Sequence, residues 1–151
     1  MNVTKIQQEM LAAWVKDPKA NKLCYMEQPD GSVFLINKNY PTVGYFIPES
    51  KLFLDTLKCQ ELSRLPFPVF EANQENLLQP LGSYKVVQGL LVEFFEGKGG
   101  EVGIVKDLLK HFDRKAFLYQ DKEDSTILIY EAPKGAEEAQ LVGVVMPMRK
   151  I

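Results

Sequence analysis

Apolar residues recur at helical spacing in two separate stretches of this 151-residue chain. In each stretch they recur every three to four residues, which places them on one face of a helix. The first stretch holds Ile6, Met10, Leu11, Trp14 and Val15, and the second, 98 positions later, holds Ile104, Leu108, Leu109 and Phe112. The pattern predicts two amphipathic helices.

A predicted β-hairpin follows each predicted helix. Residues 22–28 and 32–37 flank a Pro-Asp-Gly turn, and residues 115–121 and 125–130 flank a Lys-Glu-Asp turn. Runs rich in β-branched and aromatic residues on both sides of a polar turn indicate two antiparallel strands. Helix and hairpin therefore come in the same order in both halves of the chain.

Each hairpin is followed by a predicted strand with a Val-Gly-x-x-x-Pro ending, at residues 43–48 and, 99 positions later, at residues 142–147. Three matches in the same order predict an internal repeat. We expect repeat unit one over residues 1–50, an intervening segment over residues 50–83, and repeat unit two over residues 84–151.

These elements predict a single domain with an α+β fold, whose two helices lie on one side of the sheets. Residues 90–96 are predicted to form a strand that enters the second unit, and residues 1–4 its shortened equivalent. In the intervening segment we expect a helix over residues 51–65, ended by a Pro-Phe-Pro break, and then a loop over residues 71–82.

Composition is typical of a globular protein, with 46% apolar and 25% charged residues. A net charge of −2 argues against a protein that coats nucleic acid by charge alone. The sequence has no run of about 18 apolar residues and no signal-peptide pattern at its start. Cys24 and Cys59 share no metal-ligand spacing, so we expect free thiols in a reducing cytoplasm.

Candidate catalytic residues are few. The single histidine, His111, lies on the polar side of the second predicted helix, with no serine or cysteine placed to be activated by it. The acidic pairs at residues 123–124 and 137–138 fall in turns, where solvation explains them. We therefore expect a non-enzymatic protein without cofactor or metal, although a carboxylate dyad assembled by the fold stays an alternative.

The chain ends in Val-Val-Met-Pro-Met-Arg at residues 144–149, followed by two more residues. This ending, with the predicted helix and hairpin over residues 102–130, resembles the bacterial sliding clamp, the β subunit of DNA polymerase III. The resemblance is best over residues 100–151, architectural over residues 1–50 and absent over residues 50–83. Clamp domains are internally duplicated, and six of them close a ring. This single domain would need six copies as a homo-oligomer, or it does not encircle DNA.

The resemblance implies a peptide-binding role for the C-terminal segment. In clamps this segment forms part of an apolar pocket for short peptide motifs of polymerases and other partners, and a neighbouring domain supplies the other wall. The corresponding residues here are Val144, Met146, Pro147, Met148 and Arg149. Methionines repack readily around a partner's side chains. Alternatively, this segment only completes the core from an edge strand that a proline ends.

The resemblance also implies that the two helices face double-stranded DNA without sequence specificity. On the second predicted helix, Lys106, Lys110 and Arg114 follow one another at i, i+4 and i+8. The first helix contributes Lys5 and Lys16. A solvated helix face explains the same charges equally well.

The sequence thus favours a clamp-like scaffold that binds peptide motifs of replication or repair proteins, and that contacts no membrane. Two alternatives stay open. One is a monomeric α+β interaction protein with another role, such as an accessory protein of a mobile element. The other is a small-ligand-binding domain that uses the segment over residues 50–83, since function often lies in an inserted loop.

Overall fold

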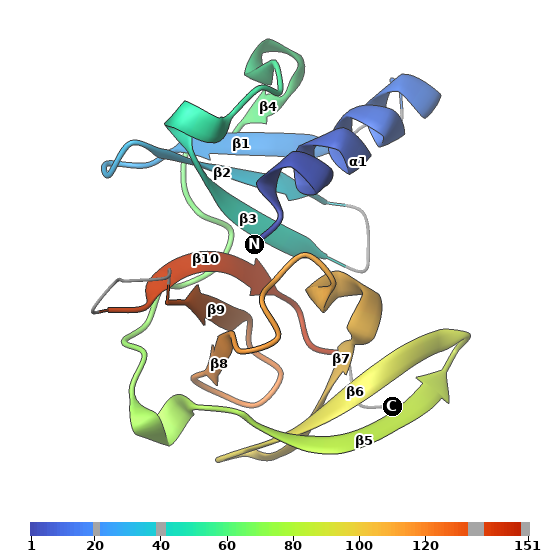
Figure 1. The fold of residues 1–151 in the computed structure, drawn as a ribbon, viewed down its shortest axis with the longest axis vertical. Coiled ribbons are helices and arrows are strands. Elements are labelled where there is room, and N and C mark those ends of the chain that lie inside the picture. Colours follow the sequence, from blue (N-terminus) through green and yellow to red (C-terminus); the bar gives the residue numbers. More distant parts are fainter. Residues whose placement is uncertain (20–21, 39–41, 133–137, 149–151) are drawn as a thin grey trace.

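The computed structural model describes residues 1–19, 22–38, 42–132 and 138–148 (Figure 1). Within these ranges the chain forms one α-helix, α1 (Val3–Lys16), and two β-sheets. The mixed α+β character predicted from the sequence is therefore confirmed. None of the described helices is long and apolar enough to cross a membrane.

The larger sheet has seven strands in the order β4-β1-β2-β3-β10-β9-β8. All neighbours are antiparallel except β4 and β1. Both predicted hairpins and both predicted Val-Gly strands are confirmed. The strands are β1 (Leu23–Glu27), β2 (Ser32–Asn37), β3 (Val43–Pro48), β4 (Gln60–Glu61), β8 (Phe117–Gln120), β9 (Ile127–Glu131) and β10 (Gln140–Val145).

Strands from the first and last thirds of the chain meet at the β3–β10 pair. Gly44 lies opposite Val144, and Tyr45 lies opposite Gly143. The set β1-β2-β3 extends to one side of this pair and the set β10-β9-β8 to the other (Figure 1).

The second sheet is a three-stranded meander of β5 (Gln79–Val87), β6 (Leu90–Gly97) and β7 (Gly100–Val105). Its first turn has positive φ at both central residues, 51° at Gln88 and 79° at Gly89. This is the geometry that two-residue hairpins require. The predicted strand over residues 90–96 is confirmed, whereas the predicted loop over residues 71–82 is wrong at its end, where β5 begins.

The second predicted helix is wrong. Ile104 belongs to β7, a short 3₁₀ helix η4 (Lys106–Leu109) follows, and the chain then turns to Phe112. Ile104, Leu108 and Phe112 are all buried. A strand followed by a turn therefore places these residues, four positions apart, in the core as a helix would. The structure therefore has one α-helix in its described residues and not the two that we expected on one side of the sheets.

Two smaller predictions are also wrong. The segment after β3 holds two 3₁₀ turns, η1 (Glu49–Lys51) and η2 (Thr56–Lys58), in place of a helix over residues 51–65. The start of the chain enters α1 at Val3 and forms no strand. A further 3₁₀ turn, η3 (Gln74–Asn76), precedes β5.

Each face of the seven-stranded sheet has its own apolar cover. On one face, α1 lies beside β1–β3 and the three-stranded sheet lies toward β8–β10 (Figure 1), and together they enclose the larger core. On the other face, residues 62–70 pack across the strands. The Phe67 ring lies 5.4 Å from the Phe34 ring and 6.4 Å from the Phe46 ring, centroid to centroid. This part of the intervening segment therefore has a structural role.

Candidate binding groove and the C-terminal segment

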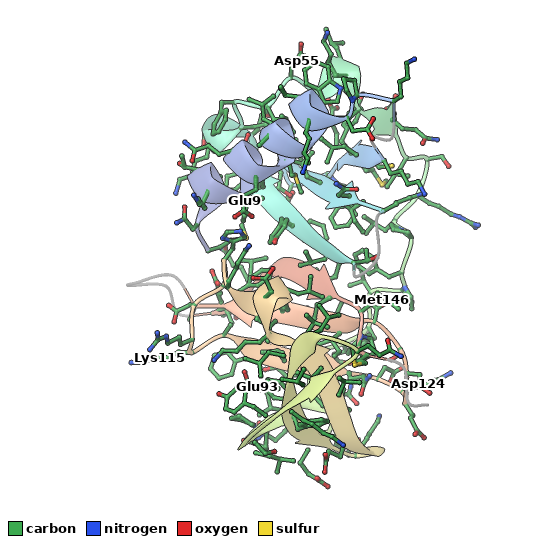
Figure 2. All side chains as sticks on the ribbon, turned by 90° about the vertical axis from the view of Figure 1, so that its right-hand side faces the viewer. Glu9, Asp55, Glu93, Lys115, Asp124 and Met146 are labelled. Carbon is green, nitrogen blue, oxygen red and sulfur yellow. The ribbon has the colours of Figure 1, made fainter. Side chains whose placement is uncertain are left out.

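A cavity of about 950 Å³ opens between the β5–β6 hairpin, η4, residues 110–116 and the β8–β9 pair. We call this cavity the groove. Its volume lies at the upper end of the range for ligand pockets in proteins. The β6 strand forms one wall because Leu91, Glu93 and Phe95, at alternate positions, all line it. Glu93 is labelled in Figure 2.

The floor of the groove is apolar. Its deepest side chains come from the approach to β5, from β6, from the chain after η4 and from β8 and β9. They are Leu78, Phe95, Phe112, Leu118 and Ile129, and each is at most 9% exposed. Tyr84 and Leu91, which are nearly half exposed, continue this apolar surface toward solvent.

The rim of the groove is charged and balanced. Three cations, Lys106, Lys110 and Arg114, face three acids, Glu93, Asp107 and Asp113. The Lys106 Nζ lies 4.6 Å from the centroid of the Tyr84 ring, a cation–π contact. The Lys110 Nζ lies 3.5 Å from the Asp107 Oδ1.

Glu9 on α1 joins the helix to the segment that follows η4 (Figure 2). Its carboxylate lies 2.7 Å from the His111 Nε2 and 3.4 Å from the Lys110 Nζ. Partial burial raises the pKa of Glu9, but the contacts with His111 and Lys110 lower it by more. The pKa of Glu9 therefore lies below its ordinary value of 4.5. The expected solvent-facing position of His111 is wrong, because its side chain is buried against Tyr45 and Glu9.

The five cations that we expected to face DNA are divided between two places. Lys106, Lys110 and Arg114 form no helical stripe, because only the first belongs to η4 and all three stand on the rim of the groove. Lys5 and Lys16 are exposed on α1.

The C-terminal residues expected to bind peptide are largely covered. Val144 is 3% exposed within the core that residues 62–70 cover, and Pro147 is buried. Met148 is half-buried, and its N–H donates to the Gly103 carbonyl at 2.8 Å. Met146 is 38% exposed (Figure 2), with the Thr126 Oγ1 3.1 Å from its sulfur. Arg149 lies outside the described residues.

The hollow beside Pro147 and Met148 measures about 10 Å³, far too little for a partner's side chain. The groove, by contrast, was not predicted from the sequence. Its walls come from segments up to about 50 residues apart, and no local pattern in the sequence pointed to it.

The described residues hold neither a metal-ligand cluster nor an activated thiol. They contain no group of three or more His, Cys, Asp or Glu side chains that could hold a metal ion. Burial raises the pKa of the Cys59 thiol to about 11 and also raises that of Cys24. Both thiols are therefore protonated at neutral pH and are poor nucleophiles.

Comparison with family models, with curated proteins and with solved structures gave no significant match for this chain.

Proposed function

We propose that this chain is a non-enzymatic, clamp-like scaffold that binds a short, extended peptide of a partner protein in the groove. The observation that carries the proposal is the form of the groove, which is large enough for a ligand. Its floor is apolar, and the positive and negative charges on its rim balance. Such a floor accepts leucine or phenylalanine side chains, and the rim accepts polar groups of either sign on both sides of them.

The edge of β5 supplies backbone partners for the peptide. Val87 and Leu90 flank the two-residue turn and therefore form a hydrogen-bonded pair. Because such pairs alternate along antiparallel strands, Lys85 and Val92 form the next hydrogen-bonded pair. The N–H and C=O groups of Tyr84 and Val86 therefore point away from β6, toward the free edge of the sheet. An extended segment that pairs with this edge runs along the mouth of the groove.

The strand order supports the clamp-like part of the proposal, because two sets of three strands meet at the β3–β10 pair. A two-fold axis perpendicular to the sheet would exchange only residues that lie on the same face, as the directly opposed Gly44 and Val144 do. The sequence repeat instead matches Gly44 with Gly143, and these glycines lie on opposite faces of the sheet. We therefore propose that the order of the strands is duplicated, and that structurally equivalent residues are offset by one position from those that the sequence repeat pairs.

The groove replaces the C-terminal segment as the proposed peptide site, since the described part of that segment, residues 144–148, exposes only Met146 and part of Met148. DNA contact is not part of the proposal. Three acids balance the three cations on the rim, whereas a surface that binds DNA needs a local excess of positive charge.

The test is titration of the purified protein into a fluorescein-labelled clamp-binding peptide, read by anisotropy, with a control peptide whose leucine and phenylalanine are replaced by alanine. Leu91→Ser should weaken binding about tenfold, because it removes an exposed apolar wall of the groove without opening the core. The matched control is Val69→Ser, which should leave the affinity unchanged. Val69 is exposed to a similar extent but lies on the face of the seven-stranded sheet that is remote from the groove.

Two outcomes would contradict the proposal. One is equal affinity for the peptide and its alanine control, or no binding to either. The other is loss of binding in Met146→Ala with full binding in Leu91→Ser, which would return the site to the C-terminal segment.

A further inference from the structure

Four large apolar side chains are exposed on α1 and on the segment after η1, remote in sequence from the residues that line the groove. Their exposed fractions are 40% for Leu11, 64% for Val15, 52% for Phe53 and 91% for Leu57. We call these four residues the α1 stripe. Single exposed apolar residues are ordinary, but a contiguous group on one surface marks an interaction site.

The four residues are contiguous because residues 53–58 run along the helix. The Gln7 Oε1 accepts hydrogen bonds from the N–H groups of Phe53 and Leu54, both at 2.8 Å. Two turns further along α1, the Lys58 Nζ lies 5.0 Å from the centroid of the Trp14 ring. The segment therefore follows the side of α1 on which Gln7 and Trp14 lie.

Leu11 and Val15 extend this side of α1 toward solvent, since they come one and two turns after Gln7. Leu57 is held outward by a fixed turn, because the Asp55 Oδ1 accepts a hydrogen bond from its N–H at 3.0 Å. Asp55 is labelled above the helix in Figure 2. The exposure of Leu57 is thus built into the fold.

Lysines flank the α1 stripe on both sides. Lys5 and Lys16 lie on the solvent side of α1, about a quarter of the helix circumference from Leu11 and Val15. Lys51 and Lys58 lie on the other side, just before and at the end of the segment that runs along the helix, where the acids Glu49 and Asp55 also lie. In the parts of the chain that the structure describes, none of these four ammonium groups takes part in an ion pair.

We propose that the α1 stripe binds an amphipathic helix with acidic flanks, supplied by a partner protein. The apolar face of such a helix covers the stripe, and its acidic flanks lie against the two pairs of lysines. A second copy of this chain would bring lysines against lysines. Duplex DNA would leave the exposed leucines and valine facing phosphates.

The probe is a synthetic helix of about 18 residues, or five turns, with leucines on one face and glutamates on both flanks, labelled with fluorescein. Its control has lysine at every glutamate position. We expect the acidic helix to bind the full chain, to weaken as salt is raised, and to bind at least about tenfold more tightly than the basic control.

The double variant Val15→Ser/Leu57→Ser should reduce that affinity by at least about tenfold and keep the far-ultraviolet circular dichroism spectrum of the native chain. Val69→Ser and Leu91→Ser should bind the acidic helix as the native chain does. Leu91→Ser thereby distinguishes this surface from the groove, so that each proposal can be refuted while the other still holds.

Three results would overturn the proposal: no binding of the acidic helix, equal binding of its basic control, or full affinity in the double variant. Displacement of the bound helix by a short DNA duplex would assign the surface to nucleic acid instead. Self-association of the free chain that the double variant abolishes would assign it to a second copy.

Discussion

Replacing Gln7 with alanine should destabilise the whole domain, although the residue lies on a surface helix and carries no charge. Its side chain is completely buried. The Oε1 accepts hydrogen bonds from the N–H groups of Phe53 and Leu54, and the Nε2 donates to the Lys51 carbonyl at 3.0 Å. One side chain thus anchors an otherwise irregular segment to α1.

The magnitude follows from what the substitution leaves unpaired. The N–H of Leu54 is buried, and a buried unsatisfied donor costs about 1–3 kcal/mol. The neighbouring groups at Phe53 and Lys51 regain water, because both residues are exposed, and add less. With the lost burial of the side-chain methylenes, we expect a loss of about 3 kcal/mol, against a total stability of about 5–15 kcal/mol for a domain.

Urea unfolding measures this loss, with circular dichroism as the probe and the fluorescence of Trp14, the single tryptophan, as a second signal from the same helix. Gln8→Ala is the matched control, since Gln8 is exposed one position further on. That control should change the free energy of unfolding by less than about 0.5 kcal/mol. Gln7→Met keeps the length of the side chain but not its polar atoms, so it should lose nearly as much as Gln7→Ala.

A loss below about 1 kcal/mol in Gln7→Ala would refute the reasoning, because it would mean that water replaces all three bonds without cost. A large loss in Gln7→Ala with a small one in Gln7→Met would assign the effect to the cavity and not to the hydrogen bonds.

Two further predictions concern the centre of the molecule. Gly143→Ala should lower the free energy of unfolding in urea by about 1–3 kcal/mol, because a Cβ there would meet the Phe112 ring at 2.5 Å. The control Gly99→Ala, whose Cβ would lie 3.5 Å from its nearest neighbour, should lower it by almost nothing. Equal losses in the two variants would contradict this. The depressed folded-state pKa of Glu9 stabilises the fold above about pH 4.5, and this contribution is lost as the pH falls through the folded-state pKa. The difference in urea midpoint between the native chain and Glu9→Gln should therefore shrink in acid, and a pH-independent difference would argue against the pairing with His111.

The hairpins could be predicted because their turns are decided by nearby residues. In the first hairpin, the Asp30 Oδ1 accepts a hydrogen bond from the Ser32 N–H at 2.9 Å, and Gly31 adopts a φ of +88°. Both features can be read from a Pro-Asp-Gly sequence. Where turn chemistry and the apolar pattern agree, the sequence predicts the strand pair well.

The second helix was predicted wrongly because a spacing of four residues does not distinguish a helix from a strand followed by a turn. Ile104 points into the core from β7, whereas Leu108 and Phe112 reach the same core from η4 and the chain after it. The residues before Ile104 carried the contrary signal. Val102 favours a strand, and Gly103 is a poor helix former.

The helix expected over residues 51–65 was wrong for a non-local reason. Gln7, more than 40 positions away, holds Phe53 and Leu54 in a non-helical conformation through their backbone N–H groups. The groove and the α1 stripe depend on similar long-range contacts. The sequence therefore predicted the first helix, the two hairpins of the larger sheet, the two Val-Gly strands and β6. It did not predict β4, β5 or β7, or the surfaces that packing creates between the elements.

The pairing of β3 with β10 has a consequence for how this chain folds. Val43 lies opposite Val145, so the centre of the larger sheet closes only when residues 102 positions apart meet. The entropy of closing so long a loop is lost before the central contacts form, which slows folding. Until that closure, β3 and β10 are both open edges rich in apolar residues, and the same edges on a second chain fit them equally well. Folding at high protein concentration therefore competes with an exchange of half-sheets between molecules.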